Sequence, residues 1–263
     1  MFKKIPQWIL AGALALSAGV SLAYPVKPIT IIVPFAAGTV SDIGASEIAK
    51  IIATIAQQSV VVENRVGAEG TIGTQAMLNT PADGHTMVFA SNSITVFDPL
   101  LKLNLPYDSV KDIVPVCGAG RTNLLINVTG SGTLKNVGDV VAAAKAQPGK
   151  LTFGYTSTSM RLAGEMFQQV TRTKLTGVPY KSSITGLTDV SSGQVDLIFI
   201  DRVSAAPFHD SGKVRPLAAS GTQRIKALPT FRPQPRRVCP VILSCPGSGS
   251  TSRARPPRPS ATR

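Results

Sequence analysis

Acidic residues, aromatic residues and cysteine are all scarce in this sequence. Its 263 residues include 14 Asp and Glu against 27 Lys and Arg, three Cys and 5% aromatic side chains. The two histidines, His85 and His209, are far apart and no cysteine cluster accompanies them, so the spacing of a zinc site is missing. No G-x-S-x-G element and no evident nucleophile–base pair is present. We therefore expect no bound metal, no cofactor and no catalytic residues.

Long apolar runs are also absent after residue 23, where no segment approaches the ~20 apolar residues that a membrane helix needs. The one apolar stretch, Trp8–Val20, follows two lysines and leads into the small residues Ser21-Leu22-Ala23. This order is typical of a signal peptide over residues 1–23 that is cut before Tyr24, and an uncleaved membrane anchor is the alternative. We expect the mature protein to be exported and soluble, outside the cytoplasm.

The net charge of +13 is concentrated at the two ends of the chain. The leader contributes two lysines, and residues 232–263 contribute seven arginines with no Lys, Asp or Glu. Residues 24–231 therefore carry a net charge of only +4, which suits an acidic ligand without demanding one. Because no stripe of basic and aromatic residues is present, nucleic-acid binding is not expected.

The segment after Phe231 lacks apolar periodicity and is rich in Pro, Arg, Ser and Gly. Such a composition cannot bury enough surface to offset its ordering entropy, so we expect residues 232–263 to be disordered. A natural disordered tail and an out-of-frame reading of the gene are both consistent with this composition. Cys239 and Cys245 lie in this segment, and a disulfide between them is one alternative. Cys117 is expected to be a buried, inert thiol.

Strand-like and helix-like segments alternate between these two ends. Apolar patterning predicts strands at residues 29–33, 60–63, 86–90, 124–128, 151–154 and 195–200, and helices at 42–57, 74–79, 136–147 and 161–171. The apolar face of the first helix would consist of Ile48, Ile51, Ile52 and Ile55. This alternation predicts an α/β fold with parallel sheets covered on both faces, and the mature length allows two lobes.

The start of the mature chain predicts an anion site. The strand Ile29–Val33 runs into a small-residue loop, Ala36–Thr39, and Ser41 and Asp42 are suited to cap the helix that follows. A strand, a tight loop and a helix N-terminus point free backbone N–H groups toward one place. We therefore expect the capture of a small acidic solute, with a helix cap as the alternative role of Asp42.

Seven segments in order carry a resemblance to a known family. They are YPVKPITIIVPFAAGTVSD (24–42), VVVENRVGAEGTIGTQ (60–75), PADGHTMVFASNS (81–93), LPYDSVKDIVPV (105–116), LAGEMF (162–167), VPYKSSITGLTDVSSGQVDLIF (178–199) and SGKVRPLA (211–218). From about Tyr24 to Phe231 the chain resembles the tripartite tricarboxylate transporter substrate-binding proteins, also called the Bug family of periplasmic solute receptors.

The resemblance implies an α/β, two-lobed periplasmic-binding-protein-like fold of type II, with a hinge of crossing strands. Residues 24–118 and 221–231 would form the first lobe, and residues 119–220 the second. The family normally continues past Phe231 with elements that complete the first lobe. We therefore expect an incomplete first lobe and an out-of-frame tail over residues 232–263.

The resemblance also implies a function. The protein would be a monomeric receptor, not an enzyme, that binds a small carboxylate and delivers it to the membrane components of a tripartite transporter. A non-functional truncated receptor and an α/β enzyme acting on a carboxylic acid are the alternatives. The identity of the carboxylate does not follow from the resemblance.

The same resemblance implies the residues that contact the ligand. On the first lobe these are Phe35, Ala37, Gly38, Thr39, Ser41, Asp42, Ser91, Asn92 and Ser93. On the second lobe they are Tyr155, Thr156, Ser157, Arg161, Lys181 and Asp201. Arg161 and Lys181 are the candidates for a charge contact with a carboxylate, and a surface position is the alternative for Arg161. Two residues depart from the family pattern: Val40 lies in a loop that usually has consecutive glycines, and Arg161 stands where the family has histidine.

Overall fold

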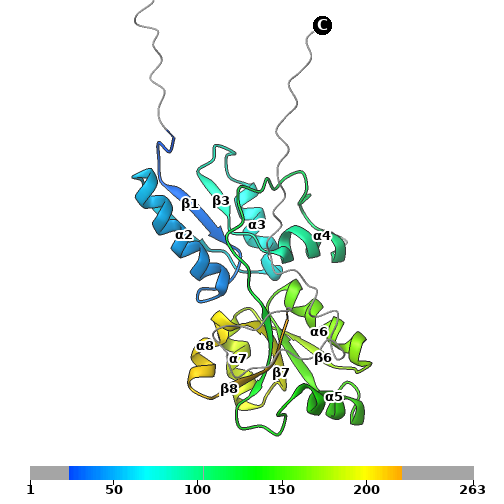
Figure 1. The fold of residues 1–263 in the computed structure, drawn as a ribbon. Helices are drawn as coiled ribbons and strands as arrows, with labels where there is room; N and C mark the ends of the chain where they lie inside the picture. The colour runs from blue at the N-terminus through cyan, green and yellow to red at the C-terminus, as the bar shows by residue number, and fades with distance from the viewer. Residues whose placement is uncertain (1–23, 103, 221–263) are drawn as a thin grey trace, which may run out of the picture.

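Two separate β-sheets, each with its own helices, organise the chain into two lobes (Figure 1). The computed structural model describes residues 24–102 and 104–220. The expected signal peptide, the return of the chain to the first lobe at 221–231, the expected disordered tail and the pair Cys239 and Cys245 lie outside the described residues.

The first lobe contains a three-stranded parallel sheet in the order β2-β1-β3. The central strand β1 (Ile29–Val33) is the β-branched run expected from the sequence, and it is buried almost throughout. It pairs with β2 (Val60–Asn64) on one side and β3 (Thr86–Val88) on the other. The helices of this lobe are α2 (Val40–Ala56), the 3-10 turn η1 (Ala68–Gly70), α3 (Thr71–Leu78), η2 (Ser93–Phe97) and α4 (Asp98–Leu101).

Helix α2 differs from the expectation in its start and in its buried face. It begins at Val40 with Thr39 as N-cap, because the Thr39 hydroxyl accepts the backbone N–H of Asp42. Its buried stripe is built on Ala45 and Ala49, whereas Ile51 and Ile55 are 58% and 78% exposed. The small alanines let the helix approach the sheet, and residues 51 and 55 fall outside the i, i+4, i+7 stripe that starts at residue 45.

The second lobe contains a five-stranded sheet in the order β6-β5-β7-β4-β8. Its strands are β4 (Leu124–Thr129), β5 (Thr152–Tyr155), β6 (Thr176–Pro179), β7 (Leu197–Asp201) and β8 (Val214–Ala219). The expectation of purely parallel sheets is wrong here, since β4 runs antiparallel to both β7 and β8. The reason is that β4 enters this lobe from the first lobe, next to the edge where β7 ends at Asp201, so it must run away from that edge.

Helices α5 (Val137–Ala146), α6 (Thr158–Thr171), α7 (Ser183–Ser192) and α8 (Arg202–Asp210) belong to the second lobe. Asn136 caps α5 as expected and forms a capping box with Asp139. Phe153, Phe167 and Phe199 lie at the centre of the core. Gly164 lets α6 approach the sheet, because a Cβ atom there would come within 2.3 Å of the Phe153 ring.

An extended segment, residues 113–123, carries the chain from the first lobe to β4 (Figure 1). Its first nine residues are almost all exposed, including Val114, Val116 and Cys117. The expectation of a buried thiol at Cys117 is therefore wrong. A lone thiol is usually buried, but Cys117 lies on a segment that crosses between the lobes and is exposed.

Candidate functional site

The loop between β1 and α2 is held in place by the side chain of Asp42. Its Oδ2 accepts the backbone N–H of Gly38 at 2.9 Å, and its Oδ1 accepts the side-chain amide of Asn64 at 2.8 Å. The Thr39 hydroxyl donates to Ala36 O at 2.8 Å. Asp42 is thus engaged in fixing the loop, and the amides free for an anion are those of the first turn, Val40 and Ser41, where the helix provides no acceptor.

The remaining candidate residues of the first lobe follow β3. Ser91, Asn92 and Ser93 form the turn into η2, in which Ser91 O accepts the backbone N–H groups of Ile94 and Thr95. Ser93 is completely buried. Its hydroxyl donates to Ser159 Oγ of the second lobe at 2.9 Å and accepts the backbone N–H of Ser159 at 3.2 Å. This turn therefore meets the start of α6 directly.

The Tyr155–Ser159 loop supplies the opposite wall. Ser157 is the N-cap of α6, its Oγ lies 3.1 Å from Ser159 Oγ, and Thr156 Oγ1 donates to Met160 Sδ at 3.1 Å. The structure thus brings Ser93 together with Ser157 across the two lobes, through Ser159. Helix α6 begins at Thr158 and not at Arg161 as expected, because Ser157 already supplies the extended conformation of a cap.

A second contact between the lobes joins Thr158 and Arg161 of the second lobe to carboxylates of the first lobe. Thr158 Oγ1 lies 2.5 Å from Glu69 Oε2 and 2.5 Å from Asp98 Oδ1, both on the first lobe. A hydroxyl has one proton, so Thr158 donates to only one of these carboxylates at a time. Arg161 Nη1 lies 3.9 Å from Glu69 Oε1. Asp98 is completely buried, and its counter-ion is Lys102, with Nζ 3.1 Å from Asp98 Oδ2.

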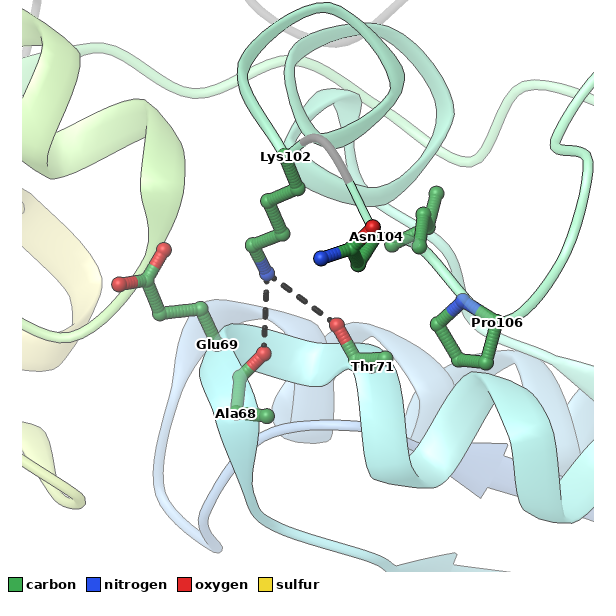
Figure 2. Close-up of a pocket in the computed structure, with 7 residues that line it drawn as sticks. Ala68, Glu69, Thr71, Lys102, Asn104 and Pro106 are labelled. Atoms are coloured by element: carbon green, nitrogen blue, oxygen red, sulfur yellow. Dashed lines mark hydrogen bonds between the residues drawn. The ribbon is translucent and has the colours of Figure 1, made fainter.

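Lys102 is also one of the residues that line a pocket beside this contact (Figure 2). Its Nζ donates to Ala68 O at 3.0 Å and to Thr71 Oγ1 at 3.1 Å, so it offsets the charge of Asp98 without a well-aligned hydrogen bond to Oδ2. The pocket has a volume of about 260 Å³ and is lined by Ala68, Glu69, Thr71, Lys102, Asn104, Leu105 and Pro106.

Two candidate residues of the second lobe lie in other surroundings. Lys181 is exposed, just after β6, next to Tyr180, whose hydroxyl donates to Asp189 at 2.7 Å. Burial and the Asp189 carboxylate raise the pKa of Tyr180 to about 12. Asp201 is buried and caps α8, accepting the backbone N–H of Ser204 at 2.8 Å and its hydroxyl at 2.9 Å. Burial raises the pKa of this carboxyl group.

The other candidate residues lie in the loop between β1 and α2 or at the start of α2. The Phe35 ring lies beside Gly70, where a Cβ atom would come within 3.4 Å of the ring. Ala37 and Gly38 are exposed, and Thr39 and Ser41 are buried. Gly38 has a φ of +78°, a conformation that other residues rarely adopt, so a larger side chain there would strain the loop.

The sequence patterns did not single out Glu69, Asp98, Thr158 or Lys102. Glu69 lies in a glycine-rich turn, Gly67–Gly73, and it adopts a φ of +57° although it is not a glycine. A charged side chain in a turn of glycines was the available signal. Asp98 gave none, because it lies in an otherwise apolar stretch, VFDPLL, and its partners come from distant parts of the chain.

Two features are absent from the described part of the chain. Within 24–102 and 104–220, no three His, Cys, Asp or Glu side chains are grouped so that they could hold a metal ion. Over the same ranges no helix is both long enough and apolar enough to cross a membrane.

The chain is similar to known proteins over most of its length. The family described as "Tripartite tricarboxylate transporter family receptor" matches residues 45–234. A UPF0065 protein of Bordetella bronchiseptica is 33% identical over 217 residues, which cover 82% of this chain and 65% of that protein. The chain thus spans slightly less than two thirds of the length of this relative.

Solved structures show the same fold. The R. palustris protein Rpa4515, solved with adipate, is 30% identical with a TM-score of 0.79, and the alignment covers 83% of this chain and 74% of that one. The periplasmic binding protein BugD is 26% identical with a TM-score of 0.72, over 80% and 71% of the two chains. The expected two-lobed periplasmic-binding-protein-like fold is confirmed.

Proposed function

The chain belongs to the tripartite tricarboxylate transporter receptor family, and on that premise we propose that it is a periplasmic receptor for a small carboxylate. The ligand binds between the two lobes, and the protein, as a monomer, delivers it to the membrane components of a tripartite transporter. Adipate, the ligand named for Rpa4515, belongs to the proposed class of ligands.

The observation that carries this proposal is the contact between the polar turn of the first lobe and the start of α6, together with the free amides at the start of α2 on the first lobe. The first turn of α2 has free amides at Val40 and Ser41, and the start of α6 faces Ser93 with hydroxyl groups. Hydroxyl and amide donors suit a carboxylate, which only accepts hydrogen bonds when ionised. Arg161 and Lys181 supply positive charge on the second lobe.

The free energies that such contacts contribute can add up to micromolar affinity for a carboxylate. A helix N-terminus contributes about 0.3–1 kcal/mol toward an anion, and up to ~2 kcal/mol when partly buried. A hydrogen bond to a charged group contributes about 1.5–3 kcal/mol. Micromolar affinity corresponds to about 8.2 kcal/mol, so several such contacts and the exclusion of water by closure are required together.

Titration calorimetry of the mature chain tests the proposal, with adipate, other di- and tricarboxylates and neutral sugars as ligands. We expect saturable heat with at least one carboxylate and none with sugars. Lys181→Ala should weaken carboxylate binding about tenfold through the lost charge, whereas Lys174→Ala, which removes an exposed lysine outside the candidate site, should not. Binding of neutral sugars without any carboxylate would contradict the ligand class, and turnover of a carboxylic acid would contradict the receptor.

A further inference from the structure

Glu69 combines an unfavourable backbone conformation with contacts to the opposite lobe. Both Ala68 and Glu69 have positive φ values, +46° and +57°, a region that side chains with a Cβ atom rarely adopt. Such a conformation persists only when surrounding contacts hold it. In the described structure, the Glu69 carboxylate contacts Thr158 and Arg161 on the second lobe.

Those contacts place its carboxylate at the start of α6. Oε2 accepts the hydroxyl of Thr158, the first residue of the helix, at 2.5 Å, and Oε1 lies 3.9 Å from Arg161 Nη1. The Glu69 and Arg161 side chains are 22% and 35% exposed, so both are partly shielded from water. A carboxylate of the chain itself therefore lies among donors that a bound carboxylate would use.

The neighbouring Asp98 explains how this contact can be released. Its Oδ1 is also 2.5 Å from the Thr158 hydroxyl, and Lys102 compensates its charge. When Glu69 leaves, the single proton of Thr158 still has an acceptor. No buried hydroxyl is then left without a partner, which would otherwise be costly.

We propose that Glu69 is a built-in competitor of the ligand. In the ligand-free protein its carboxylate holds the start of α6 and joins the two lobes, and a carboxylate ligand must displace it to reach Thr158 and Arg161. This inference rests on the proposed function. It makes Glu69 a determinant of affinity and predicts that ligands lacking a carboxylate cannot replace it.

The test compares Glu69→Gln and Glu69→Gly with the wild-type chain. Gln keeps the size and removes the charge, and Gly also removes the conformational strain. We expect both variants to bind adipate about tenfold more tightly in calorimetry, because the internal competitor is gone. Glu63→Gln is the matched control, since the Glu63 carboxylate pairs with Arg65 within the first lobe. It should leave the affinity unchanged.

Hydrogen exchange supplies a readout that needs no ligand. The backbone N–H of Ser159 donates to Ser93 across the lobes, so its protection reports their contact. Without ligand, Glu69→Gln and Glu69→Gly should exchange at Ser159 several times faster than the wild type, and so should Thr158→Val, which removes the hydroxyl at constant shape.

The outcomes separate the two proposals. Carboxylate binding by the wild type that stays equal or weakens in both Glu69 variants overturns the competition but leaves the receptor function. A lack of carboxylate binding in all variants overturns the receptor function and the competition with it. In either case, unchanged exchange at Ser159 overturns the role of Glu69 in joining the lobes.

Discussion

The two lobes bury their apolar residues to very different extents. The second lobe has two clusters of buried side chains around a five-stranded sheet, with three phenylalanines at the centre. In the described part of the first lobe, the buried cluster consists of Ile31, Val33, Ala45 and Ala49. Large apolar side chains such as Ile55, Leu100 and Val110 are exposed there, at 78%, 77% and 85%.

This difference indicates where the folding free energy resides. Buried apolar area is the main favourable contribution to folding, so the second lobe is stabilised by its own core. The described part of the first lobe is stabilised more by its strand pairing and by its contacts with the start of α6. We therefore expect an alanine substitution in the core of the second lobe to cost more than one at the exposed apolar residues of the first lobe.

The largest expected effect comes from the aromatic core of the second lobe. Phe153 is fully buried and meets Phe199 edge-on, with ring centroids 5.8 Å apart. Phe153→Ala should lower the free energy of unfolding by about 3–5 kcal/mol, because it removes buried contacts and leaves a cavity. Ile55→Ala on α2 should change it by less than ~0.5 kcal/mol. Urea unfolding followed by circular dichroism measures both, and a similar cost for the two would refute the contrast between the lobes.

The N-caps of α5 and α2 allow a second comparison of the two lobes, with smaller expected changes in stability. The Asn136 side chain accepts the backbone N–H of Asp139 at 3.0 Å, and the Asp139 carboxylate accepts the backbone N–H of Asn136 at 3.2 Å. Thr39 accepts the backbone N–H of Asp42 at 3.4 Å. Asn136→Ala should therefore destabilise by about 1–2 kcal/mol and Thr39→Ala by ~0.5 kcal/mol. Native-state hydrogen exchange of α5 and α2 measures each, and the reverse order would count against a better-capped second lobe.

The smallest expected effect concerns pH and His209 in the second lobe. Burial, with Arg202 nearby, lowers the pKa of His209, and its Nε2 lies 2.6 Å from Asn127 Oδ1. A lowered folded-state pKa means that the stabilising contribution is present above the unfolded pKa of about 6.5 and is lost as pH falls through the folded value. The wild type should thus lose more stability than His209→Gln between pH 7.5 and pH 5, in urea unfolding at both values. An equal loss of stability in the two proteins would show that His209 does not cause the pH dependence.

Local sequence signals were reliable where neighbouring residues decide the structure. The run Ile29–Val33 forms β1 with the expected bounds, because β-branched residues favour an extended backbone. Asn136 caps α5 as expected, since a cap involves only the next three residues. The seven family-like segments led to the correct family and to the correct two-lobed fold.

Sequence signals failed where residues distant in the chain decide the structure. The isoleucine spacing of α2 did not reveal that Ile51 and Ile55 would face solvent, since the approach of the sheet selects the buried stripe. The direction of β4 depends on how the chain enters the second lobe. The candidate ligand residues remain predictions, and among them Asp42 and Asp201 have their carboxylates engaged in fixing their own helix starts.

The sequence by itself determined the α/β class and the positions of most strands and helices, because these depend on local propensity and on the periodicity of apolar residues. It also determined the family, through the seven segments that resemble it. Only the tertiary structure decided which polar groups meet between the lobes. Glu69 and Thr158 are 89 residues apart, and Asp98 is 60 residues from Thr158. Contacts of this kind leave no local pattern, since each residue's partner is set by the placement of one sheet against the other.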